Sequence, residues 1–170
     1  CLPGLPAADR DAAPLQAPDA RWQLVGAPRD ANGAELLPGA RAELDALAAL
    51  HPGSTLALGA ECDRAALERA LASGAPLHLA THVVFGECAG SSRFASAGLE
   101  LALGERLRAR ELAALRPRLP LAFLAACETG GGRFVDALGL QGIARAFLEG
   151  GTRNLLVTSW PIADDAARTF

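Results

Sequence analysis

The stretch that decides the fold is residues 121–130, which read LAFLAACETG. Its first six residues are all apolar, and a continuous apolar run is typical of a strand buried on both faces of a parallel sheet. Cys127 follows the run, and Gly130, Gly131 and Gly132 then break it. The sequence therefore places a thiol where a strand stops and a loop begins, which is where an open α/β sheet carries its chemistry.

Strands and helices alternate along the rest of the chain. Short apolar runs predict strands at 22–26, 55–58, 77–81 and 155–158, and apolar residues at helical spacing predict helices at 38–51, 63–73, 108–115 and 136–148. Leu99, Leu101 and Leu103 alternate with other residues and predict a half-exposed strand. The pattern predicts an α/β fold in which a mostly parallel sheet is covered by helices on both faces.

Composition argues against several kinds of site and partner. The net charge is −3, which does not favour nucleic acid or an acidic membrane surface, and no apolar run reaches the roughly 18 residues of a membrane span. The four cysteines are Cys1, Cys62, Cys88 and Cys127, and none has C-x-x-C spacing or a histidine three to five residues away. We therefore expect no zinc site, no cofactor and no disulfide framework. Reduced thiols favour a cytoplasmic location.

The length of 170 residues fits one domain. Residues 1–20 contain four prolines and predict a linker, so the domain is expected to occupy residues 21–170. The chain begins with Cys1, and its last residues read as the first turns of a helix. We expect an excerpt from a longer protein, with the domain truncated at its C-terminus.

A histidine stands in a matching position on another predicted strand. His82 follows the run Leu77–Thr81 and precedes Cys127 by 45 residues. Alone, either side chain can be a core residue, as a small buried thiol or a hydrogen-bonded imidazole. Together they fit a cysteine nucleophile and a histidine that acts as base and acid near neutral pH. Their separation is similar to the spacing of about 50 residues between histidine and cysteine in caspases, so the pair indicates a cysteine peptidase.

Other polar and glycine-rich positions allow more than one interpretation. The glycines after Cys127 let backbone N–H groups approach a bound carbonyl, whereas the missing G-K-[ST] ending argues against a phosphate loop. Asp164 and Asp165 follow the last predicted strand. They can cap a helix and complement its dipole, or line a pocket for a basic side chain of a substrate. His78 is expected to pack or form a hydrogen bond near the sheet edge.

Several segments together resemble a known family. They are ATH at 80–82, ACETG at 126–130, LGLQGIARAF at 138–147 and SWPIADD at 159–165, with LPGARAE at 37–43 and SAGLELA at 96–102 upstream. In this order, from about residue 22 to the end, they resemble the CHAT domain. CHAT domains are caspase-like cysteine peptidases related to separase, and in bacteria they are often joined to tetratricopeptide repeats.

The resemblance implies a fold and a set of site residues. It implies a caspase-like three-layer sandwich, with Cys127 as nucleophile and His82 as general base and acid. It also implies an oxyanion hole made by the backbone N–H groups of Val83 and Cys127. In separase-like relatives an acidic residue near the last strand selects a basic residue before the cleaved bond, and Asp164 or Asp165 matches that place.

One residue departs from the family pattern. The family has a small residue directly after the histidine, whereas this chain has Val83. A β-branched residue disfavours a positive φ, so an oxyanion hole that needs a glycine-like turn would be impaired. The first hypothesis is therefore a cysteine endopeptidase that cleaves a protein substrate and is regulated by an adjoining repeat or sensor region. The alternatives are a catalytically weak or inactive interaction module of the same family, and a generic α/β ligand-binding domain.

Overall fold

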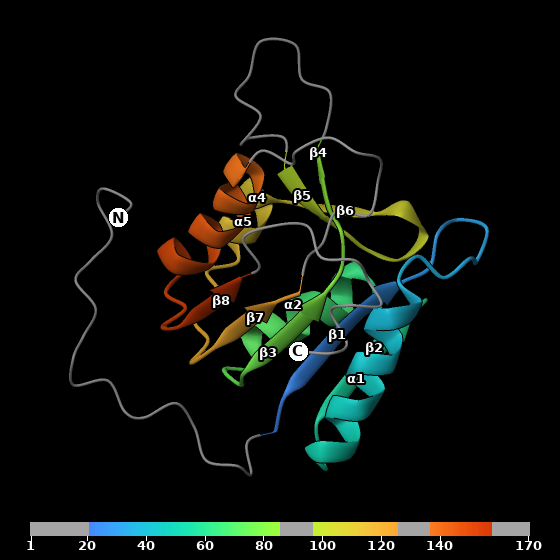
Figure 1. Ribbon diagram of the computed structural model, residues 1–170. Coiled ribbons are helices and arrows are strands. Elements are labelled where there is room, and N and C mark those ends of the chain that lie inside the picture. Colours follow the sequence, from blue (N-terminus) through green and yellow to red (C-terminus); the bar gives the residue numbers. More distant parts are fainter. Residues whose placement is uncertain (1–20, 86–96, 126–136, 158–170) are drawn as a thin grey trace.

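The computed structural model describes residues 21–85, 97–125 and 137–157 (Figure 1). Its centre is a five-stranded sheet with the order β2-β1-β3-β7-β8. The strands are β1 (Gln23–Pro28), β2 (Thr55–Gly59), β3 (Leu77–Ala80), β7 (Ala122–Leu124) and β8 (Leu155–Val157). All neighbouring pairs in this sheet run parallel. The predicted parallel sheet is confirmed, and the LAFLAACETG stretch supplies one of its inner strands.

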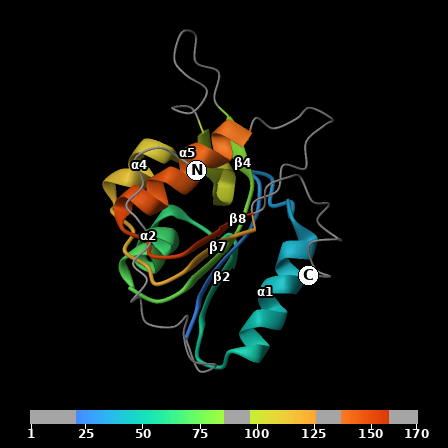
Figure 2. The ribbon, with the colours of Figure 1, turned by 60° about the vertical axis from the view of Figure 1, so that its left-hand side comes forward.

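Helices cover both faces of this sheet. Helix α1 (Pro38–Leu50) lies on one face, and α2 (Arg64–Ala72), α4 (Ala109–Ala114) and α5 (Ala137–Gly150) lie on the other (Figure 2). Each side has its own apolar core: Leu24, Leu37, Leu44 and Ala80 toward α1, and Leu67, Leu79, Leu112, Leu124 and Phe147 toward the other helices. The fold is therefore a three-layer α/β sandwich of the caspase-like kind, as predicted.

A second, antiparallel sheet extends the structure beyond the end of β3. It contains β4 (Val83–Phe85), β5 (Ala97–Glu100) and β6 (Arg106–Arg108) in that order, and the short 3₁₀ helix η1 (Ala102–Gly104) joins the last two. The prediction of a half-exposed strand through three alternating leucines is wrong. Leu99 and Leu101 are both fully buried, whereas Leu103 is 67% exposed and has a φ of 60°, because the chain turns there.

Helix α2 follows its sequence signals closely. The Asp63 carboxylate accepts a hydrogen bond from the backbone N–H of Ala66 at 2.7 Å, which satisfies one of the free amides of the first turn. Leu67 and Leu71 are buried against the sheet, and Gly74 ends the segment with a φ of +69°. No helix in the described ranges is both long and apolar enough to cross a membrane.

Candidate active site

His82 lies two residues beyond the carboxyl end of β3, between the two sheets. The side chain of Thr81, which precedes it, is buried, and its hydroxyl donates a hydrogen bond to the backbone carbonyl of Glu100. The backbone N–H of Glu100 in turn donates to the carbonyl of His82 at 2.9 Å. These bonds fix the backbone on both sides of the half-buried His82 side chain.

The segment that leads to Cys127 leaves the sheet beside His82. In the parallel pair β3–β7, Leu79 is in register with Leu124, and the N–H of Ala125 donates to the carbonyl of Leu79 at 2.9 Å. His82 and Cys127 each come three residues after the registered pair. Neighbouring strands lie about 4.8 Å apart, so both segments emerge at the same point of the sheet edge.

Three of the predicted site residues lie outside the described residues. They are Cys127, Asp164 and Asp165. Their roles, and the approach of Cys127 to His82, therefore remain predictions. Ala125 is the last described residue before Cys127.

His82 also stands at the point where the sheet topology reverses. The chain goes from β1 outward to β2 and then returns to β3 on the other side of β1. In open α/β sheets the carboxyl ends of two such strands border the crevice that binds ligands. The end of β1 is irregular here, because its register shifts between Gly26 and Pro28 and the intervening Ala27 has a φ of 46°. Such bulges are frequent next to active sites, where they redirect the chain.

The backbone of Val83 is compatible with the predicted oxyanion hole. Val83 pairs with Leu99 across β4 and β5, while the neighbouring N–H of Glu100 bonds to His82. This pattern makes Val83–Leu99 a non-hydrogen-bonded pair of the antiparallel ladder, so the N–H of Val83 points away from β5. Val83 lies in an extended strand, and its side chain is buried in the core. The β-branched residue is therefore placed without a positive φ.

Sequence reasoning missed two arginines at the same sheet edge. A Cβ built on Gly59 would lie 3.1 Å from Nη2 of Arg41 and 3.3 Å from Nε of Arg29, so the two guanidinium groups converge there. Arg41 forms an ion pair with Glu35, whereas Arg29 has no ion-pair partner among the described residues. The two arginines therefore meet at this corner, and one of them is paired with an acidic side chain. No local motif predicts it, because the arginines come from segments on either side of the loop after β1.

The other two histidines do not lie at the carboxyl ends of the strands, where His82 lies. His51 follows the last turn of α1 and contacts Trp22, with ring centroids 5.9 Å apart, at the opposite end of the sheet. His78 lies within β3, where its ring packs against Phe123 and its Nε2 lies 3.1 Å from a carboxylate oxygen of Glu43. The prediction that His78 lies near the sheet edge is wrong, because β3 is the central strand.

Cys62 is not a competing nucleophile. Its side chain is fully buried at the start of α2. Burial, and secondly the negative charge of Asp63, raise the pKa of the Cys62 thiol from 9.0 to about 12. A thiol with so high a pKa contributes almost no thiolate at neutral pH. Within the described ranges no group of three or more histidine, cysteine or acidic side chains is arranged to hold a metal ion.

Comparisons with known proteins identify the family of this chain through one family model. No curated protein matches this sequence. Among solved structures, the crystal structure of protein GSU0716 from Geobacter sulfurreducens is similar, with 17% identity and a TM-score of 0.44 over 75% of this chain and 61% of that one. The chain thus spans less than two thirds of that protein, and a likeness at this level adds nothing to the assignment. The CHAT domain family model matches residues 5–170, so this chain belongs to the CHAT domain family.

Proposed function

We propose that this domain is a cysteine endopeptidase in which Cys127 is the nucleophile and His82 is the general base and acid. The observation that carries the proposal is the register of β3 and β7. Leu79 and Leu124 are in register, and His82 and Cys127 each follow this pair by three residues, which supports placing both reactive residues at one edge of the sheet. Membership of a peptidase-like family supports the same assignment.

The proposed reaction has two stages. His82 takes the proton of the Cys127 thiol, and the thiolate attacks the carbonyl carbon of the scissile peptide bond. The backbone N–H groups of Val83 and Cys127 donate to the resulting oxyanion. His82 then gives its proton to the leaving amine as the C–N bond breaks, which leaves a thioester on Cys127. Water, deprotonated by His82, attacks this thioester; the C–S bond breaks, His82 returns the proton to the Cys127 thiolate, and the acid product is released.

Three features of the described residues support these roles. His82 is half-buried rather than enclosed, which leaves room for contact with a substrate. The N–H of Val83 is not used by the β4–β5 ladder, so it is available to an oxyanion. The buried thiol of Cys62 is kept protonated, which leaves it unsuited to the same chemistry.

The substrate and setting follow from the family resemblance. We propose that the substrate is a protein and that Asp164 or Asp165 selects a basic residue before the cleaved bond. We also propose that an adjoining repeat or sensor region controls the activity, and that the protein works in the cytoplasm, where its thiols stay reduced.

Labelling with peptidyl electrophiles tests the proposal. The full-length protein is treated with acyloxymethyl ketones that carry Arg, Lys or Asp next to the warhead, and the labelled cysteine is identified by mass spectrometry. We expect rapid labelling of Cys127 that is lost in Cys127→Ala, falls at least 100-fold in His82→Ala and is unchanged in Cys62→Ala. Circular dichroism spectra of all variants show whether the fold is intact.

The outcomes separate the hypotheses. Labelling that prefers Arg or Lys supports the acidic pocket, whereas a preference for Asp keeps the peptidase and removes the pocket. Labelling of Cys127 that is equally fast without His82 refutes the dyad. If Cys127 stays unlabelled in a folded protein that includes its adjoining regions, the domain is a non-catalytic interaction module instead.

A further inference from the structure

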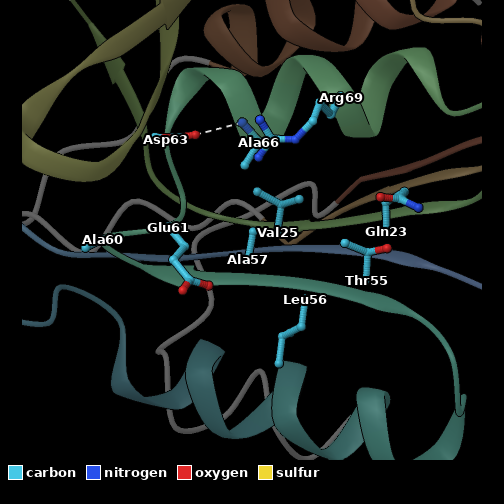
Figure 3. Close-up of a pocket in the computed structure, with 10 residues that line it drawn as sticks. All are labelled: Gln23, Val25, Thr55, Leu56, Ala57, Ala60, Glu61, Asp63, Ala66 and Arg69. Atoms are coloured by element: carbon cyan, nitrogen blue, oxygen red, sulfur yellow. Dashed lines mark hydrogen bonds between the residues drawn. The ribbon is translucent and has the colours of Figure 1, made fainter.

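A pocket of about 350 Å³ lies on the other side of β1 from His82, where α2 passes over β1 and β2 (Figure 3). Strand residues, loop residues and α2 residues line it together: Gln23, Val25, Thr55, Leu56, Ala57, Ala60, Glu61, Asp63, Ala66 and Arg69. Figure 3 shows Thr55 and Ala57 on the α2 side of β2 and Leu56 on the α1 side. Because residues of both faces of β2 line the pocket, it opens at the outer edge of that strand.

The outer edge of β2 presents unpaired backbone groups. The N–H of Thr55 donates to the carbonyl of Trp22 at 2.9 Å, so the backbone of Thr55 faces β1. Along a strand the backbone groups of successive residues point alternately to the two neighbouring sides. The N–H and C=O groups of Leu56 and Leu58 therefore point away from β1. The carbonyl of Leu58 accepts from the N–H of Glu61 in the following turn. The N–H and C=O of Leu56 and the N–H of Leu58 have no partner among the described residues.

This edge also lacks the features that protect exposed strands. The sequence of β2 is TLALG, which contains no charged residue and no proline. Natural sheets block open edges with such residues or cover them, because unpaired edges invite another strand. Within the described residues β2 is the terminal strand of the sheet, with β1 as its only paired neighbour. The edge is therefore suited to pair with an additional strand.

A positively charged side chain lines the pocket beside the outer edge of β2. Arg69, in the last turn of α2, is exposed to solvent, lines the pocket, and has no ion-pair partner among the described residues. Figure 3 shows its side chain reaching along α2 above Val25 and Ala57. The nearby Asp63 carboxylate is engaged as the cap of α2. An unpaired guanidinium in a concave site favours a carboxylate, with which it can form two parallel hydrogen bonds.

We propose that the outer edge of β2 binds an extended segment of a partner protein as a sixth strand, with an acidic side chain of that segment against Arg69. The three groups of Leu56 and Leu58 that lack a partner among the described residues supply the main-chain hydrogen bonds. A side chain at the level of Ala57 projects to the α2 side, where Arg69 lies. Such strand addition obtains affinity from the backbone and specificity from pockets for alternate side chains. The site is separate from His82 and does not depend on peptidase activity.

A displayed library of random dodecapeptides shows which extended segments this edge prefers. The library is selected against the 170-residue chain carrying Cys127→Ala, so that no peptide is cleaved. Selected peptides are synthesised, and their affinities are measured by fluorescence anisotropy for this protein and for further variants of it. We expect one acidic position to be shared among the selected peptides.

Three variants test the two parts of the site. Arg69→Gln removes the charge and keeps a polar side chain, and we expect at least tenfold weaker binding. Leu56→Pro removes the outward N–H without touching the β1 ladder, and we expect a similar loss. Leu56→Ala is the matched control, since it shortens the same side chain but keeps the N–H, and binding should stay within about threefold of the parent.

Amide exchange gives an independent measurement if Leu56→Pro does not fold. The bound peptide should protect the amides of Leu56 and Leu58 from deuterium exchange and leave those of β8, at the other edge, unchanged. The proposal is overturned if the selected peptides share no acidic position, or if they bind Arg69→Gln as tightly as the parent. It is also overturned if the bound peptide does not protect the amides of β2. A chain that dimerises through β2, or selected peptides that match this chain's own sequence, would equally overturn it by showing a different occupant.

Discussion

The free energy of unfolding should fall above pH 9 because of one buried thiol. In the folded chain burial raises the pKa of Cys62 to about 12, against 9.0 for a free thiol. Between these two values the unfolded chain loses the proton while the folded chain keeps it. The unfolded state then binds fewer protons, so stability decreases as the pH rises. Well below pH 9 the thiol is protonated in both states and has no effect on the pH dependence.

The size of the effect follows from the two pKa values. Proton linkage lowers the free energy of unfolding by about 0.4 kcal/mol at pH 9 and by about 1.4 kcal/mol at pH 10. The replacement Cys62→Ala removes this contribution. It also removes a buried sulfur atom, which costs about 1 kcal/mol at every pH. The parent should therefore be more stable by about 1 kcal/mol at pH 7.5, and the two proteins should be about equally stable near pH 10.

Urea denaturation in the presence of a reductant measures this difference. The sequence makes the comparison unusually clean, because it contains no lysine and no tyrosine. The other three thiols and the terminal amine are present in both proteins, so they cancel in the difference between parent and variant. Tryptophan fluorescence reports unfolding through Trp22 and Trp160. If the difference between parent and Cys62→Ala is the same at pH 7.5, 9 and 10, burial does not keep the Cys62 thiol protonated and the reasoning is refuted.

Three substitutions test the packing around the sheet, each by urea or thermal denaturation. Gly26→Ala should destabilise by about 3 kcal/mol, because the new Cβ would lie 2.3 Å from the carbonyl oxygen of Ala80; a loss below about 1 kcal/mol would show that the strands can separate there. Gly150→Ala should cost about 2 kcal/mol, since its Cβ would lie 2.4 Å from Cδ of Pro117, and an unchanged midpoint would contradict that contact. Asp63→Ala should cost about 1 kcal/mol through the lost cap of α2, whereas Asp63→Asn keeps an accepting oxygen and should cost only a few tenths; equal losses in both would show that the cap bond is not the cause.

The parallel sheet was predictable because burial on both faces leaves a strong sequence signal. Leu121–Ala126 and Leu77–Thr81 are short apolar runs, and the structure places β7 and β3 within them as neighbours. The starts of α1 and α2 were predictable for a different reason. Pro38 and Asp63 act locally at the first turn of a helix, so their effects do not depend on the rest of the fold.

The small antiparallel sheet was not predictable from local patterns. Strands β4 and β6 have three residues each, which is too short for an alternation to be recognised. In β6, Leu107 is buried between two exposed arginines, and the same pattern occurs in many loops. Leu103 continued the leucine alternation after β5, yet it lies in a turn. Its exposure is set by the backbone bond from its N–H to the carbonyl of Arg29, a contact between distant segments.

In the candidate site, too, features set by one segment were predictable, and features set by contacts between distant segments were not. The place of His82 follows from the end of a single apolar strand, and the structure puts it beyond the carboxyl end of β3. The convergence of Arg29 and Arg41 depends on the bulge that ends β1 and on Gly59, which has no Cβ to separate the two side chains. No spacing within one segment carries that information. The approach of these two arginines is therefore a property of the fold rather than of a motif.

Val83 illustrates how an inference about one residue changes once its backbone is known. From the sequence, a β-branched residue after the histidine is a defect only if the chain must turn there with a positive φ. In the structure Val83 instead begins the edge strand β4, and a β-branched residue suits an extended conformation. Its buried side chain anchors that strand, and the non-hydrogen-bonded pairing with Leu99 turns its N–H away from β5. The N–H directly after His82 is therefore outside the β4–β5 ladder, and Val83 has no positive φ, so its β-branched side chain is by itself no argument for an impaired oxyanion hole.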